Sequence, residues 1–98
     1  MRLTNTEIFY IQEIFKEVFQ KGEIYLFGSR VDDTLKGGDI DLFVSSNNRD
    51  NYLEKKLDFL TLLKQKIGDQ KIDLVISKDK NRLIEKEALT KGISLCKI

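Results

Sequence analysis

The alternation of acidic and apolar residues from Asp39 to Val44 is the feature that most constrains how this chain can fold. Side chains two residues apart on a β-strand point to the same face of a sheet. The pattern therefore predicts a strand over residues 39–44 that turns Asp39 and Asp41 to one face. Ile40, Leu42 and Val44 of the same strand turn to the other face, where we expect a core.

A second apolar run, Glu23–Phe27, ends in the turn Gly28-Ser29-Arg30. We expect a short buried strand followed by a brief helical turn. Glycine lets a backbone approach a phosphate closely, while turn N–H groups, a hydroxyl and a guanidinium are phosphate ligands. Paired carboxylates repel each other, and a hard divalent cation relieves that repulsion. Together the two segments predict a site for a metal ion and a nucleoside triphosphate.

These residues resemble the signature of the minimal nucleotidyltransferases, within the polymerase-beta-like superfamily: a Gly-Ser turn, a spacer and Asp-x-Asp. Nine residues separate Ser29 from Asp39 here, one fewer than is usual in that family. The family has a third carboxylate on a later strand, which Asp73 in the run Lys71–Ile76 matches. The resemblance implies an α/β (α+β) nucleotidyltransferase fold, a small mixed β-sheet flanked by helices, forming one domain over residues 1–98.

The resemblance also implies an activity, the transfer of a nucleoside monophosphate, AMP from ATP, to an acceptor hydroxyl. In this interpretation Asp39, Asp41 and Asp73 are catalytic and hold two Mg²⁺ ions, with Mn²⁺ as the alternative. Short relatives resemble antitoxins that pair with a HEPN-type ribonuclease toxin and transfer AMP to a toxin tyrosine. A protein partner of this kind, or a homo-oligomer, is therefore expected. The residues expected to bind the triphosphate are Gly28, Ser29 and Arg30.

Two other functions are compatible with the sequence. One is a catalytically inactive binding module that neutralises a partner protein by contact, and the other is a nucleotide-sensing regulatory domain. The presence of all three carboxylates favours the enzyme, whereas the shortened spacer keeps the inactive module open. Magnesium-dependent transfer of labelled AMP to a partner separates the enzyme from both alternatives.

Composition excludes several kinds of site. The chain has 98 residues, no histidine and one cysteine, so Ser-His-Asp and Cys-His catalysis and histidine zinc sites are excluded. Its formal net charge of +1 provides no bulk attraction to nucleic acid. No apolar run approaches the roughly 20 residues that span a bilayer. The single Cys96 favours a reducing compartment, and a cytoplasmic location is expected.

Helical spacing of apolar residues predicts a first helix from Thr4 or Thr6 to about Lys21. Phe9 lies off its apolar stripe, and we predict that a partner protein or a second copy covers it. The stripe consists of Ile8, Ile11, Ile14, Phe15, Val18 and Phe19.

A second helix is predicted from a cap at Asn51 to about Ile67, before Gly68. A last helix, capped by Asp79 or Asn81, is expected to run to about Lys91 and to precede a strand over Ile93–Cys96. The residues expected to face the core from the second helix are Leu53, Leu57, Leu60, Leu63 and Ile67.

Overall fold

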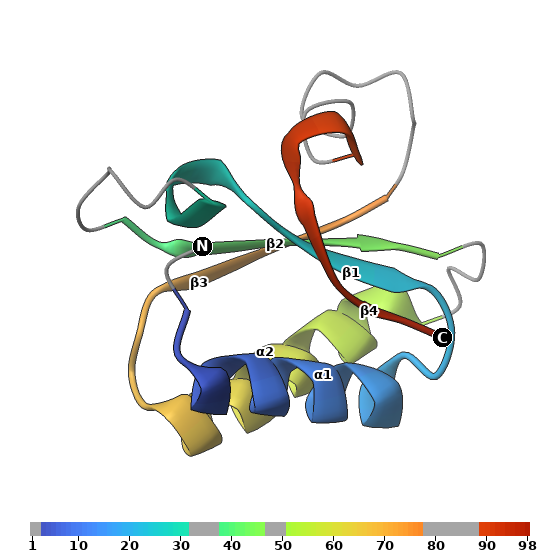
Figure 1. Cartoon of the computed structure of the whole chain (residues 1–98). Helices are drawn as coiled ribbons and strands as arrows, with labels where there is room; N and C mark the ends of the chain where they lie inside the picture. The colour runs from blue at the N-terminus through green and yellow to red at the C-terminus, as the bar shows by residue number, and fades with distance from the viewer. Residues whose placement is uncertain (1–2, 32–37, 47–50, 78–88) are drawn as a thin grey trace.

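The structure, a computed structural model, is a mixed α/β fold in which two long helices cover one face of a four-stranded sheet (Figure 1). It describes residues 3–31, 38–46, 51–77 and 89–98. None of the helices within these ranges is both long and apolar enough to cross a membrane. The predicted fold class, a small mixed sheet flanked by helices, is confirmed.

Helix α1 spans Asn5–Val18 and begins at a capping box. The Glu7 backbone N–H donates to Thr4 Oγ1 at 3.1 Å, and the Thr4 backbone N–H donates to Glu7 Oε1 at 2.8 Å. These two bonds satisfy donors that the first helical turn otherwise leaves open. The predicted start at Thr4 is confirmed. The helix ends at Val18 rather than near Lys21, because Gln20 takes a left-handed conformation with φ of 66°.

The sheet has the strand order β3-β2-β1-β4. Strand β1 pairs antiparallel with both β2 and β4, whereas β2 and β3 run parallel. A parallel pair needs a long crossover connection, which α2, Tyr52–Ile67, supplies. All four predicted strands are present, with ends that shift by about one residue. Their bounds are Glu23–Phe27 for β1, Ile40–Ser45 for β2, Ile72–Ile76 for β3 and Ile93–Lys97 for β4.

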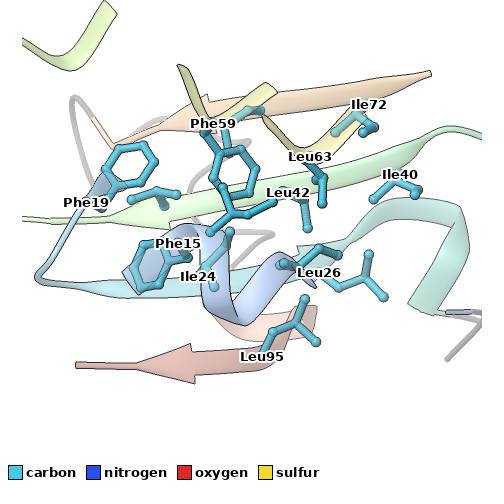
Figure 2. Packing of buried hydrophobic residues seen from close by; sticks show 14 of the residues in the cluster. Phe15, Phe19, Ile24, Leu26, Ile40, Leu42, Phe59, Leu63, Ile72 and Leu95 are labelled. Atoms are coloured by element: carbon cyan, nitrogen blue, oxygen red, sulfur yellow. The ribbon is translucent and has the colours of Figure 1, made fainter. Parts of the chain in front are cut away.

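The core lies between the two helices and the sheet. Phe15 of α1 packs against Phe19, the residue directly after α1, and the Phe19 ring centroid lies 6.0 Å from that of Phe59 of α2 (Figure 2). The strands contribute every second residue, as the alternation predicts. Fully buried examples are Ile24, Leu26, Ile40, Leu42, Val44 and Leu74.

Helix α2 corrects two predictions. Leu53 and Leu57 were expected to face the core, but their exposed fractions are 61% and 65%. Leu63 is buried as predicted, and Leu60 and Ile67 are partly buried against the core. Phe59, which was not predicted, is also buried, and its ring packs against that of Phe19. The Asn51 side chain makes no capping hydrogen bond, since this residue adopts a left-handed backbone conformation with φ of 56°.

The C-terminal part agrees with the sequence where it is described. Residues 89–91 are helical and precede Gly92, as expected for the end of the last helix. The proposed caps of that helix, Asp79 and Asn81, lie outside the described residues. Phe9 has an exposed fraction of 52%, while the predicted partner that covers it stays a prediction.

Candidate active site

Two of the predicted carboxylates meet on the sheet face opposite the helices. Asp41 of β2 stands directly beside Asp73 of β3 in the parallel register. Both residues alternate with buried apolar neighbours, so their side chains project away from the helical layer. Asp41 is half-buried and Asp73 is exposed. Asp39 directly precedes β2, whose first residue, Ile40, donates its N–H to the Lys71 carbonyl at 3.0 Å.

The three carboxylates influence one another electrostatically. Burial, and after it the negative charges of Asp73 and Asp39, raise the pKa of Asp41 above its usual value. The Lys71 Nζ lies 3.7 Å from Asp39 Oδ2, but 82% of the lysine side chain is exposed, so this pair contributes little. The cluster therefore holds excess negative charge that a bound cation would relieve.

The turn after β1 contacts this cluster through Gly28. The turn forms a short 3₁₀ helix, η1, over Gly28–Val31, which confirms the predicted helical turn. Gly28 has φ of +78°, a conformation that L side chains rarely adopt. A Cβ built on it would collide with Asp41 Oδ2. Glycine is thus required here by the backbone and also by the space that the Asp41 carboxylate occupies.

A family model described as "Polymerase beta, Nucleotidyltransferase" matches residues 10–98. The chain belongs to this family. The match includes the whole of the carboxylate cluster and the η1 turn of the nucleotidyltransferase. Among curated proteins none matches the chain.

The donor set of the nucleotidyltransferase suits the divalent ions that the resemblance implies. All three side chains offer carboxylate oxygens, the hard ligands that Mg²⁺ and Mn²⁺ accept. The donor chemistry of Asp39, Asp41 and Asp73 therefore fits these ions. Within the described ranges, however, no group of three or more His, Cys, Asp or Glu side chains is arranged closely enough to hold a metal ion. Joint binding of one ion by the three aspartates thus requires their side chains to move.

The positive charge of Arg30, in η1, helps to lower the pKa of Glu7 in α1. Burial alone would raise the pKa of Glu7. Hydrogen bonds from Thr4 and Gln70, together with the charge of Arg30, outweigh that effect and lower it. The Gln70 amide donates to Glu7 Oε2 at 2.6 Å. Glu7 was not predicted from the sequence, although Thr4-x-x-Glu7 is a recognisable capping-box pattern. The phosphate contact of Arg30 stays a prediction, as does that of Ser29, the second residue of η1.

Proposed function

We propose that this nucleotidyltransferase transfers AMP from ATP to an acceptor hydroxyl in a reaction that requires two Mg²⁺ ions. The observation that carries the proposal is the register pair of Asp41 and Asp73, set against the Gly28 turn in a member of this family. The raised pKa of Asp41 supports it, because mutually repelling carboxylates are suited to a divalent cation.

Each element of the site has a role in this reaction. The N–H groups at the start of η1 face the triphosphate, and Gly28 allows its close approach. Asp73 accepts the proton of the acceptor hydroxyl. The hydroxyl oxygen bonds to the α-phosphorus, and the bond from that phosphorus to the bridging oxygen breaks, with its electron pair leaving on pyrophosphate. Asp39, Asp41 and Asp73 would hold the two divalent ions, whose positive charge would stabilise the entering and leaving oxygens.

We further propose that the acceptor is a protein hydroxyl, such as a tyrosine of a HEPN-type toxin, for which this chain acts as antitoxin. The near-neutral net charge of +1 supports a protein rather than a polynucleotide, since nucleic-acid binding rests on many cationic contacts to phosphates.

The test is to incubate the purified chain with Mg²⁺ and [α-³²P]ATP in the presence of a soluble extract of the cells that produce it. The proposal expects a labelled acceptor and equimolar pyrophosphate, both abolished by EDTA. The matched variant Asp41→Asn should label the acceptor about 10²–10³-fold more slowly. ATP binding without any transfer would favour the nucleotide-sensing alternative, and absence of both would favour the inactive binding module.

A further inference from the structure

The first turn of α1 holds a buried charge that has no part in the proposed reaction. Of the charged side chains that the structure describes, Glu7 alone is buried, with an exposed fraction of 8%. A buried carboxylate loses its hydration and is retained where hydrogen bonds replace the lost water. The capping box uses one of its oxygens, Oε1, which accepts the Thr4 backbone N–H. The partner of the other oxygen, Oε2, therefore shows what Glu7 does besides capping the helix.

Glu7 Oε2 joins α1 to the loop that leads into β3. The Gln70 side-chain amide donates to this oxygen at 2.6 Å and to the Ile67 carbonyl at 3.2 Å. Residues 68–71 connect the end of α2 to β3, and this connection passes the first turn of α1 (Figure 1). A single side chain, that of Gln70, thus ties the loop to both helices.

The loop places the backbone from which two of the predicted metal ligands project. In the strand order of the described sheet, β3 lies at the edge and pairs with β2. Lys71, directly after Gln70, accepts the Ile40 N–H on its carbonyl at 3.0 Å. Ile40 directly follows Asp39, and Asp73 is the second residue of β3. A displacement of the loop would therefore move both carboxylates relative to each other.

Binding of a divalent ion makes this placement important. The three aspartates of the described site must already rotate their side chains to share one ion. A shift of the edge strand would add a backbone displacement to that rotation. Residues that hold metal ligands in place typically change metal affinity about 10–100-fold. The charge of Arg30 helps to lower the pKa of Glu7, so its carboxylate stays ionised and accepts the Gln70 hydrogen bond at neutral pH.

We propose that Glu7 and Gln70 are positioning residues whose hydrogen bond holds the start of β3 against β2, in the place from which Asp39 and Asp73 bind a divalent cation. The inference rests on the proposed function, which it extends from the metal ligands to the residues that place them. The alternative is that Glu7 serves only the stability of the helix start.

The experiment uses Mn²⁺ alone as its probe, with the purified full chain and no nucleotide. Bound Mn²⁺ is measured by the loss of the free-ion signal in electron paramagnetic resonance. Gln70→Met keeps the length of a half-buried side chain but removes its donor, and it should raise the Kd for Mn²⁺ about tenfold. Glu7→Ala combined with Gln70→Met should bind no more weakly than Gln70→Met alone, because both substitutions remove the same hydrogen bond.

Thr4→Ala is the matched control for helix stability. It removes the hydroxyl that accepts the Glu7 N–H but keeps the backbone N–H that donates to Glu7 Oε1. The melting temperature should fall by about 4–8 °C, while the Kd for Mn²⁺ should stay at the parental value. Asp41→Asn should weaken Mn²⁺ binding, which identifies the measured ion as the one at the carboxylates. Equal weakening in Thr4→Ala and Gln70→Met would reduce Glu7 to a stabilising cap and overturn the proposal.

The transfer assay with [α-³²P]ATP supplies a second readout. In Gln70→Met the Mg²⁺ concentration that gives half the maximal rate should rise about tenfold, while KM for ATP at saturating Mg²⁺ should stay unchanged. A rate that falls by the same factor at every Mg²⁺ concentration would contradict the positioning role.

Failure of this inference differs from failure of the proposed function. Parental Mn²⁺ affinity in Gln70→Met would overturn the positioning role alone. Weakened Mn²⁺ binding in Gln70→Met, without nucleotide transfer by the parent chain, would keep the positioning role and overturn the proposed transfer. Absence of Mn²⁺ binding by the parent chain would overturn both.

Discussion

The two faces of the sheet differ in what their side chains contact. On the helical face, Ile40, Leu42 and Val44 of β2 are fully buried in a single apolar core. On the other face, the same strand offers Asp41 and Phe43, and the ring of Phe43 packs in a separate small cluster with Phe27. On this second face the strand thus contributes both a buried ring, Phe43, and the half-buried carboxylate of Asp41.

A second carboxylate on this face, that of Glu23, has hydrogen-bond donors. The Glu23 carboxylate accepts hydrogen bonds from the hydroxyls of Tyr25, at 2.6 Å, and Ser94. Burial and the Glu23 hydrogen bond raise the pKa of Tyr25 to about 12. The hydrogen bonds from Ser94 and Tyr25 lower the pKa of Glu23. This carboxylate accepts hydrogen bonds, whereas burial and the like charges of Asp73 and Asp39 all raise the pKa of Asp41.

The largest expected effect separates function from stability. Asp41→Asn keeps the shape of the side chain and removes one of the repelling charges. Transfer should fall about 10²–10³-fold, the scale for loss of one group that stabilises transition-state charge. The free energy of unfolding at neutral pH should stay the same or rise, as measured by urea denaturation. A variant that transfers at the parental rate would contradict the assignment of Asp41.

The next effect compares neighbouring residues on opposite faces of β3. Leu74 is fully buried, and Leu74→Ala should lower the free energy of unfolding by about 2–5 kcal/mol. Val75 is half-buried on the other face, and Val75→Ala should cost less than about 1.5 kcal/mol. Equal losses in urea denaturation would show that both faces contribute alike to stability.

A smaller loss of stability is expected from Gly28→Ala. The positive φ should cost about 1–2 kcal/mol, and the added Cβ must displace the Asp41 carboxylate. Transfer should therefore decrease along with the melting temperature. Gly68→Ala is the control, because it shares a positive φ of 90° but meets nothing within 4 Å. Similar losses of transfer in the two variants would exclude the contact with Asp41 as the cause.

The smallest effect is a difference in pH dependence. The pKa of Glu7 is lowered by folding, so the stability it contributes is present above its unfolded pKa and is lost as pH falls through the folded value. The pKa of Asp41 is raised by folding, so ionisation of Asp41 lowers the free energy of unfolding as pH rises through its pKa in the folded protein. The free energy of unfolding, measured by urea denaturation at a series of pH values, should fall less on acidification in Glu7→Gln than in the parent. In Asp41→Asn it should fall less as pH rises through the range in which Asp41 ionises. An unchanged pH dependence in these variants would contradict the two directions.

Features that depend on the local alternation of polar and apolar residues could be predicted from the sequence. The four strands, the η1 turn and the faces of Asp41 and Asp73 follow from period-two patterns and from one glycine. The inward face of α2 follows only in part, because Leu63, Leu60 and Ile67 pack in or against the core while Leu53 and Leu57, which match helical spacing equally well, are exposed. The burial of Phe59 depends on the ring of Phe19, a residue distant in sequence. The roles of Arg30 and Glu7 also depend on distant parts of the chain meeting.

The parallel pairing of β2 with β3 has a consequence for folding kinetics. Asp41 and Asp73 are far apart in sequence, and the chain must form α2 and close that long loop before the strands pair. Their repulsion opposes this step and adds to the energetic barrier for pairing β2 with β3. Neutralising either carboxylate should therefore speed refolding, which stopped-flow measurements on Asp73→Asn would show.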